Sequence, residues 1–342
     1  MVVEENQSLR ELTTLKVGGF ARYVLTCKTT EDVVEACSFA KDKNLPLVVL
    51  GEGSNVLPPD EDHDGVVLLM RIKGITYFKG ADGQVVVSVG AGESWDSFVE
   101  ETVQKGLWGL ENLAGIPGTV GAAPVQNIGA YGMEIARLIK DVSAYDTQTS
   151  THITIPAVDA AFAYRDSRFK HESHLIITGV TFILASNGEP QIQYADLQAA
   201  SREGVVLSTP AEIAAAVRVI RSRKFPDLGE YGTAGSFFKN PIISYQQFET
   251  LSAKWGALPS YPAPNGIKIP LAFILDKVLN LKGYERETTF LFGNQPLVLV
   301  ARPGARAADV DELARDIEEK VFTATGISIE REVRNLSDHE IK

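Results

Sequence analysis

The sequence lacks the features that mark membrane, secreted and metal-binding proteins. No apolar run is long enough to span a bilayer, and the acidic start at residues 1–5 lacks the basic region and apolar core of a signal peptide. The two cysteines, Cys27 and Cys37, have neither metal-ligand spacing nor the sequence context of a nucleophile. These absences predict a cytoplasmic protein with two reduced thiols and no membrane partner.

Positive charge is also scarce. Lys and Arg number 33 against 44 Asp and Glu, so the formal net charge of the 342 residues is −11. Such a chain is not expected to bind nucleic acid, although a site with local positive charge can still bind a small anion. The hydrophobic content of 44% is typical of a globular protein, and the length predicts two or three domains.

The N-terminal third alternates predicted strands and helices. Residues 23–28 form a predicted strand, and Thr30 is the predicted cap of a helix that stops before Pro46. Residues 47–50 and 85–89 are short apolar runs, which are typical of buried strands. This third of the chain is therefore expected to mix both kinds of element.

The second half opens with a clear helix signal. Thr-Pro-Ala-Glu at 209–212 is a capping box with proline in the first turn, and its helix ends in the basic run at 221–224. After Pro226 the composition shifts to turns and short elements, which indicates a domain boundary. A last amphipathic helix ending at Gly326 is followed by a predicted final strand at 327–334.

A glycine-rich loop, Gly-Glu-Gly-Ser-Asn at 51–55, follows a predicted buried strand. It is not a Rossmann fingerprint, because the third glycine is missing and Pro58-Pro59 prevents the helix that would hold a pyrophosphate. Nor is it a P-loop, since no Gly-Lys-Ser/Thr follows. Its backbone N–H groups could form an anion-binding nest, but a structural turn is about as plausible on this loop alone.

A second loop strengthens the interpretation. Residues 115–123 place glycines three apart, and glycines at 129 and 132 continue the stretch. Glycines at this spacing let a flat or extended ligand approach the backbone, and a long irregular loop in a compact domain is usually functional. Two loops suited to phosphate favour a dinucleotide over a mononucleotide.

The stretch Gly-Ser-Phe-Phe-Lys-Asn-Pro at 235–241 has the composition of a site wall. Its aromatic residues can exclude water, while the hydroxyl, amine and amide can contact one polar ligand. A turn into a buried strand is the alternative. At the end of the chain, alternation in the predicted strand puts Glu332 and Arg334 on one face, which is either a shared site or the solvated side of an edge strand.

These segments together resemble the UDP-N-acetylenolpyruvoylglucosamine reductase (MurB) family, over nearly the whole chain. The strongest resemblance lies at residues 50–57, 109–132, 164–170, 235–241 and 332–334. The stretch around Tyr194 is similar to the type I subgroup, in which a tyrosine loop closes on the substrate. Two segments depart from the type I pattern: Gly18-Gly19, which looks more like type II, and the unusual Pro58-Pro59-Asp60.

The resemblance implies an α+β fold. Two subdomains of the PCMH/vanillyl-alcohol-oxidase type, expected at residues 1–71 and 72–220, would hold FAD between them. A C-terminal α+β substrate-binding domain is expected at 221–332, with residues 333–342 returning to the second subdomain.

The resemblance also implies a reaction. The family reduces UDP-N-acetylglucosamine enolpyruvate to UDP-N-acetylmuramate in peptidoglycan synthesis, with NADPH as the hydride donor to FAD. Because we find no second dinucleotide-binding motif, NADPH and substrate are expected to use one cleft in turn, in a protein that acts as a monomer. The alternatives are another FAD oxidase or dehydrogenase of the same superfamily, or a catalytically silent nucleotide-binding relative, which would be expected to lack Ser236, Arg165 or Glu332.

Three residues receive catalytic roles by resemblance. Arg165 would pair with the substrate carboxylate as it gains enolate character; the alternative is a surface arginine paired with Asp166. Glu332 is the second stabiliser and is expected to act protonated, since an ionised carboxylate would repel a developing anion. Ser236 would protonate the α-carbon, tuned by neighbours such as Lys224 or Lys239.

Binding residues follow from the same comparison. The expected FAD contacts are Gly51, Glu52, Gly53, Ser54, Asn55, Ile116, Gly118, Gly121, Ala122, Gly129 and Arg334. The expected substrate contacts are Tyr164, Tyr194, Lys224, Asn240, Lys268 and Gln295. No histidine lies within either glycine loop, so the FAD is expected to be non-covalent, and no metal is expected because the histidines do not cluster: His63, His152, His171, His174 and His339.

Overall fold

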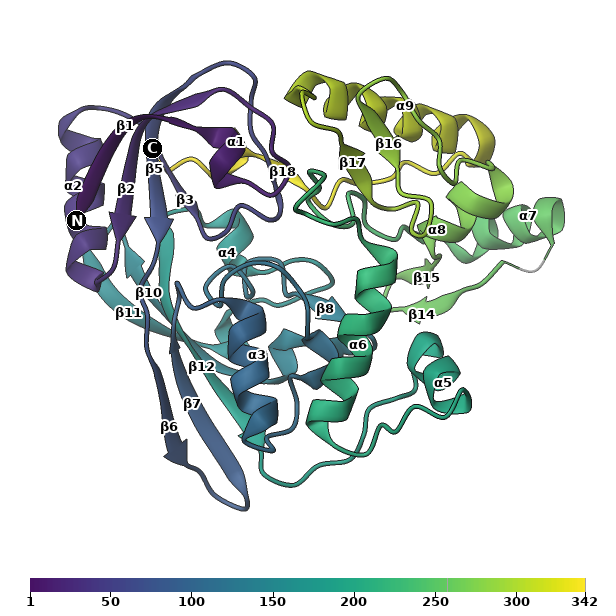
Figure 1. Ribbon diagram of the computed structural model, residues 1–342, viewed down its shortest axis with the longest axis horizontal. Coiled ribbons are helices and arrows are strands. Elements are labelled where there is room, and N and C mark those ends of the chain that lie inside the picture. The colour runs from purple at the N-terminus through teal and green to yellow at the C-terminus, as the bar shows by residue number, and fades with distance from the viewer. Residues whose placement is uncertain (257, 342) are drawn as a thin grey trace.

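The computed structural model describes residues 1–256 and 258–341, and its N-terminal part contains a four-stranded sheet (Figure 1). The first pair of strands is antiparallel and the remaining pairs are parallel, in the order β1 (Val2–Ser8), β2 (Phe20–Cys27), β5 (His63–Met70) and β3 (Leu47–Leu50). Helix α2 (Thr30–Asp42) packs against β2 and β5. Its cap is Thr29, not the predicted Thr30, because the Thr29 hydroxyl accepts the Asp32 N–H.

The second sheet is antiparallel throughout. Its strands follow the order β11 (Thr151–Pro156), β10 (Ile139–Asp146), β12 (Leu175–Ala185), β7 (Gln84–Gly90) and β6 (Ile75–Lys79). Helix α3 (Trp95–Gln104) covers this sheet, since Phe98 packs against Phe182 of β12 with ring centroids 5.2 Å apart. Helix α6 (Pro210–Lys224) packs beside α3 (Figure 1), and its capping box at Thr209 and Glu212 is confirmed.

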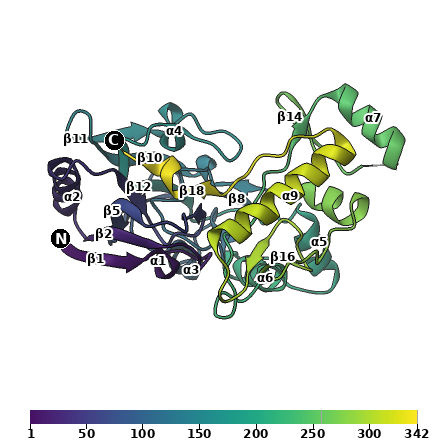
Figure 2. The same ribbon diagram turned by 90° about the horizontal axis from the view of Figure 1, so that it is seen from above.

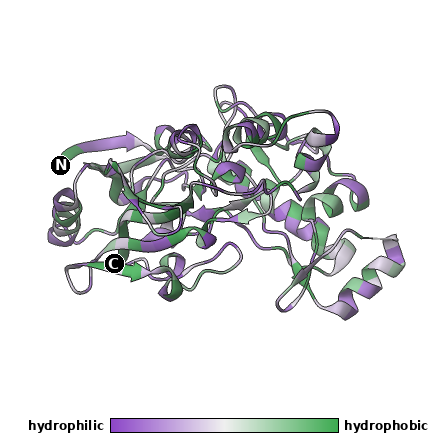
Figure 3. Ribbon diagram, turned by 90° about the horizontal axis from the view of Figure 1, so that it is seen from below, coloured by the Kyte–Doolittle hydropathy of each residue, from purple (hydrophilic) through white to green (hydrophobic). Residues whose placement is uncertain are grey.

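The C-terminal domain has its own apolar core. Its small sheets and its helices surround that core: β13 (Ile242–Ile243), β14 (Tyr261–Ala263), β15 (Gly266–Lys268), β16 (Thr289–Leu291), β17 (Leu299–Ala301), α7 (Tyr245–Trp255), α8 (Leu271–Phe273) and α9 (Ala307–Thr325). Helices with both hydrophilic and hydrophobic residues border it, as expected for elements with one buried face (Figure 3). The predicted last helix is confirmed as α9, which ends at Gly326 with φ +67°.

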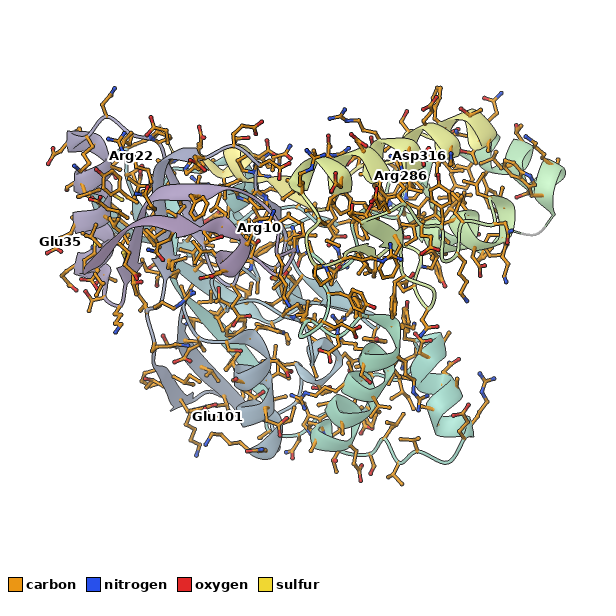
Figure 4. The ribbon with its side chains drawn as sticks, turned by 45° about the horizontal axis from the view of Figure 1, so that its top comes forward. Arg10, Arg22, Glu35, Glu101, Arg286 and Asp316 are labelled. Atoms are coloured by element: carbon orange, nitrogen blue, oxygen red, sulfur yellow. The ribbon has the colours of Figure 1, made fainter. Side chains whose placement is uncertain are left out.

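Charged contacts tie α9 to the loop before β16. Arg286 and Asp316 lie near each other in Figure 4, with Arg286 Nη2 and Asp316 Oδ2 3.4 Å apart. Tyr284 donates to the same carboxylate at 2.8 Å. No helix in the described ranges 1–256 and 258–341 is both long and apolar enough to cross a membrane.

The final strand is much shorter than predicted. Only β18 (Arg334–Asn335) is a strand, and it runs parallel to β4 (Val56–Leu57). Before it, the chain crosses from the C-terminal domain to the N-terminal sheets and makes single hydrogen bonds instead of a ladder, such as Glu332 N–H to Phe237 O at 2.8 Å. The yellow segment in Figures 1 and 2 follows this crossing.

The final segment, expected to return to the second subdomain, makes its strand pairing with the first and side-chain hydrogen bonds with the second, from Ser173 and to Lys170 O. Pairing of β18 with β4 places the segment in the first subdomain, and Ile341 exchanges backbone hydrogen bonds with Leu47 at the free edge of β3. That edge offers unpaired backbone groups, which an extended tail can satisfy. Position 220, the expected domain boundary, lies within α6, so we place the proposed boundary after Lys224.

The two unusual N-terminal segments pack on each other. A side chain at Gly18 would place its Cβ 2.8 Å from Pro58 Cγ, and Gly19 donates its N–H to Pro59 O at 2.9 Å. Arg10, labelled in Figure 4, donates to Gly18 O. Asp60 then reaches the C-terminal domain, where its carboxylate accepts the N–H groups of Ala307 and Ala308 at the start of α9, at 2.7 and 2.9 Å. These segments therefore hold two domains together.

Replacing Asp60 with alanine should destabilise the protein by about 1 kcal/mol, because two N–H groups at the start of α9 lose their acceptor. Chemical denaturation measures the change. The control is Asp64→Ala, which removes an exposed ion pair to Arg22 and should have little effect. Equal losses in both variants would contradict a specific role for Asp60.

Candidate active site

Both glycine loops and the C-terminal domain line one cavity of about 360 Å³. All residues expected to bind FAD lie on its wall, namely Gly51, Glu52, Gly53, Ser54, Asn55, Ile116, Gly118, Gly121, Ala122, Gly129 and Arg334. The expected catalytic residues Ser236, Arg165 and Glu332 lie on the same wall. The structure thus brings these two predicted sets together.

The two glycine loops are fixed to each other. Glu52 Oε2 accepts the N–H of Gly118 at 2.9 Å, and the Ser54 hydroxyl donates to Pro117 O at 3.2 Å. Gly118 has φ +124°, and a Cβ there would lie 3.0 Å from Ser54 Oγ. Glycine is required at this position because the backbone conformation is left-handed and Ser54 is so near.

Three residues of the cavity wall carry a buried polar atom without a hydrogen-bond partner among the described residues: Thr119 Oγ1, Gln295 Oε1 and His339 Nε2. Buried polar atoms without partners are unfavourable, so a group of them around one cavity indicates a polar ligand. The glycine loops leave the backbone accessible to such a ligand. The residues of this cavity therefore fit a large dinucleotide such as FAD.

Arg165 occupies an unusual backbone conformation. It lies in a tight turn in which Ala163 and Asp166 exchange backbone hydrogen bonds, and its φ is +55°. A non-glycine residue pays about 1–2 kcal/mol for this conformation. Lys170 supports the turn, since its Nζ donates to Arg165 O at 3.0 Å. Such strain is often found where a side chain is held for function.

The Arg165 side chain points to Glu332 and to the second glycine loop. Arg165 Nε lies 3.0 Å from Glu332 Oε1, although its N–H is not aligned with that oxygen, so the contact is an ion pair more than a hydrogen bond. Arg165 Nη2 donates to Gly129 O at 2.6 Å. Asp166 pairs with His171 instead, at 2.8 Å. The structure therefore does not support the alternative of a surface arginine paired with Asp166.

Glu332 is held where its ionised form is unfavourable. Its side chain is 12% exposed, and burial raises its pKa above the usual range, although the positive charges of Arg165, Lys170 and Lys239 oppose the shift. The prediction that Glu332 acts protonated is consistent with this direction. Despite the loss of a regular strand, Glu332 and Arg334 both reach the cavity, whereas Glu330 is exposed and pairs with Lys239 at 2.8 Å.

Replacing Glu332 with glutamine should change the pH dependence of stability. In the unfolded protein Glu332 loses its proton near pH 4.3, whereas in the folded protein it retains that proton to higher pH. The wild type therefore loses stability as the pH rises above about 4.3 and through the pKa of folded Glu332. The glutamine variant does not ionise at this position. Its melting temperature relative to wild type should therefore increase from pH 4 to pH 8, and a decrease would mean that Arg165 stabilises an ionised Glu332.

Ser236 lies on the cavity wall in a segment that bridges to Val298. Neither candidate relay lysine pairs with it: Lys224 Nζ lies 2.6 Å from Asp196 Oδ2, and Lys239 pairs with Glu330. Lys224 does line the cavity. Its position therefore makes Lys224 the better placed of the two for contact with a ligand.

The expected substrate residues separate into two groups. Tyr194, Lys224 and Gln295 line the cavity. The others, Tyr164, Asn240 and Lys268, do not line it but form a neighbouring cluster. In this cluster the Asn240 N–H donates to the Tyr164 hydroxyl at 3.4 Å, and Asn240 Oδ1 accepts the N–H of Leu271 at the start of α8. The amide oxygen of Asn240 therefore already has a structural partner.

Sequence reasoning missed several residues of the cavity wall. Arg221 donates from Nε to Gly115 O at 2.9 Å and lies over the Phe225 ring, and the basic run at the end of α6 could have indicated it. Tyr131 stacks edge to face on Tyr194 with centroids 5.2 Å apart. His339 carried no local signal, because the tail reaches the cavity only through pairing of β18 with β4.

The fold and cavity define an FAD-dependent oxidoreductase with a PCMH-type FAD-binding part, as predicted. Residues 21–149 match the family model described as "FAD binding domain". Residues 227–336 match the model of the C-terminal domain of UDP-N-acetylenolpyruvoylglucosamine reductase. The chain belongs to the UDP-N-acetylenolpyruvoylglucosamine reductase family.

Individual relatives agree over nearly their full lengths. The Ralstonia nicotianae reductase is 40% identical over 341 residues, 97% of this chain and 98% of the relative. The Escherichia coli reductase is 36% identical over 96% of this chain and 95% of its own. The crystal structure of the Thermus caldophilus enzyme has a TM-score of 0.69 and 27% identity, and covers 98% of this chain and 99% of its own.

Proposed function

We propose that this protein reduces the enolpyruvyl ether of UDP-N-acetylglucosamine to the lactyl ether, giving UDP-N-acetylmuramate for peptidoglycan synthesis, with NADPH as the electron source. The observation that carries the proposal is the 3.0 Å contact of Arg165 Nε with Glu332 Oε1, on the same cavity wall as Ser236 and both glycine loops. The family of the chain supports the substrate class.

The chemistry needs charge stabilisation and a proton from the protein. Bound FAD supplies hydride to the β-carbon of the enol ether. Arg165 stabilises the substrate carboxylate as it gains charge, and a protonated Glu332 donates to the developing enolate without repelling it. Ser236 then gives its hydroxyl proton to the α-carbon.

The presence of the expected cofactor-binding and catalytic residues on one cavity supports a ping-pong order. NADPH and the UDP-linked substrate would enter the same space in turn, with Tyr194, Lys224 and Gln295 at its wall to bind either ligand. We place the activity in the cytoplasm, where NADPH is available, and propose that the protein acts as a monomer and holds FAD without a covalent bond.

Anaerobic mixing of the purified protein with its ligands tests the proposal. NADPH should bleach a yellow flavin spectrum, and the enolpyruvyl substrate should restore it stoichiometrically with formation of UDP-N-acetylmuramate. Reoxidation by oxygen but not by the substrate would favour another oxidase of the superfamily, and binding without turnover would favour a silent relative. A colourless protein that cannot be reconstituted with FAD would contradict the cofactor assignment.

A further inference from the structure

Residues 13–17 connect the N-terminal FAD-binding part to the C-terminal domain. They follow the short helix α1 (Leu9–Leu12), yet Leu15 and Val17 are fully buried in the apolar core of the C-terminal domain. The fit is close, because a Cβ at Gly232 would overlap Leu15 O. This loop therefore has a fixed place against the segment that leads to Ser236.

Thr14 lies in this loop and joins the first glycine loop to Thr233. The N–H of Thr14 donates to Gly53 O at 3.2 Å, so this backbone donor is used on the glycine loop. On the other side, Thr14 O accepts the N–H of Thr233 at 2.9 Å, and the Thr14 hydroxyl donates to Thr233 O at 2.7 Å. The hydroxyl thus supplies Thr233 O with the donor that the Thr14 backbone no longer has to give.

Thr233 in turn holds the three residues that end at Ser236. Thr233 is buried, and its own hydroxyl donates to Leu299 O at 2.8 Å and accepts the N–H of Gly235 at 3.2 Å. Gly235 and Ser236 line the cavity, whereas Thr14 and Thr233 do not. A displacement of Thr233 would therefore move the Ser236 hydroxyl, although Thr14 itself touches no ligand in the cavity.

We propose that Thr14 is a positioning residue for proton transfer from Ser236, because its hydroxyl fixes residues 233–236 relative to the first glycine loop. Both the glycine loop and Ser236 lie on the cavity wall, so this link sets the distance between the proton donor and whatever the loop binds. A misplacement of about 1 Å can reduce a reaction rate about a hundredfold. This role rests on the function of Ser236 proposed above.

Replacing Thr14 with valine removes the hydroxyl but keeps the β-branched shape and both backbone hydrogen bonds. Reoxidation of the reduced flavin by the enolpyruvyl substrate should slow about tenfold, since the Ser236 hydroxyl is displaced but not lost. Bleaching by NADPH should stay near the wild-type rate, because hydride transfer needs no proton from Ser236. Thr14→Ser keeps a hydroxyl and should recover most of the lost rate.

A solvent isotope effect separates positioning from a purely structural role. If proton transfer becomes the slow step, D₂O should slow reoxidation of Thr14→Val more than it slows reoxidation of the wild type. Thr102→Val is the matched control, because the Thr102 hydroxyl donates to Val99 O at 2.8 Å within α3 and Thr102 does not line the cavity. This control should lower the melting temperature and leave both half-reactions unchanged.

A double variant completes the test. Adding Thr14→Val to Ser236→Ala should slow reoxidation no further, because a residue that acts through Ser236 has no effect once that hydroxyl is gone. A further loss in the double variant, an unchanged reoxidation rate in Thr14→Val, or equal losses in both half-reactions would overturn the role of Thr14 alone. Wild type that the substrate does not reoxidise, or Ser236→Ala that it reoxidises normally, would overturn the role of Ser236 as well.

Discussion

Replacing Ser236 with alanine should slow reoxidation of the reduced flavin by the enolpyruvyl substrate by roughly two to four orders of magnitude, the range usual for a general acid. Hydride transfer from NADPH needs no proton from Ser236, so bleaching should proceed at close to the normal rate. The location of Ser236 on the cavity wall, in the same cavity as Arg165 and Glu332, makes this separation possible. Anaerobic stopped-flow measurement of each half-reaction provides the test.

Two further variants sharpen the Ser236 experiment. Ser236→Cys, similar in size and a stronger acid, should restore part of the lost reoxidation rate. Ser252→Ala is the matched control, because Ser252 on α7 is partly buried like Ser236 but lies outside the cavity. If both half-reactions fall together in Ser236→Ala, Ser236 is a packing or cofactor residue. If neither falls, the proton comes from elsewhere, with Lys224 the next candidate.

Replacing Arg165 with lysine should reduce turnover at least roughly a hundredfold, the effect of removing one electrostatic stabiliser. The guanidinium contacts Gly129 O and Glu332 through different nitrogens, which a single ammonium cannot reproduce. The loss should appear in reoxidation by substrate, while the flavin spectrum shows that FAD remains bound. A φ of +55° is unfavourable for lysine and arginine alike, so the backbone strain at position 165 should be similar in the variant and the wild type.

Arg168→Lys is the matched control for this variant. Arg168 lies three residues after Arg165 and is the first residue of α4 (Arg168–His171). Its Nε lies 2.8 Å from Glu172 Oε1. The Arg168–Glu172 pair is partly exposed, so replacing Arg168 with lysine should leave turnover near the wild-type value. Near-normal turnover in Arg165→Lys would remove Arg165 from the mechanism, whereas equal losses in both variants would indicate general disturbance of this segment.

Local signals in the sequence predicted several of the helices and strands and the two glycine loops that line the cavity. Buried strands such as Leu47–Leu50 and the capping box at Thr209 depend on neighbouring residues, so the sequence pattern contains them. The glycine loops were recognisable because their function requires residues without side chains. Glu332 and Arg165 were identified by resemblance, and their ion pair was not predicted.

Long-range pairing explains most of what the sequence did not reveal. The predicted strand at 327–334 has suitable residues, but within it the pairing is limited to one isolated bridge, between Arg331 and Phe238, before Arg334–Asn335 pairs with β4. His339 reaches the cavity only because of that pairing. Asn240 illustrates a different limit, since its side-chain oxygen accepts the N–H of Leu271, a partner that a short motif does not reveal.

The packing of Gly18 and Gly19 against residues 58–60 limits how this protein can be recombined with its relatives. A chimera that imports a side chain at position 18 while keeping Pro58 would force two groups into one space, because the new Cβ would lie 2.8 Å from Pro58 Cγ. Exchange of residues 58–60 alone would also remove the Asp60 carboxylate wherever the relative lacks an acid at position 60, and this carboxylate accepts the N–H groups of Ala307 and Ala308. Functional hybrids should therefore take both segments, together with the start of α9, from the same parent.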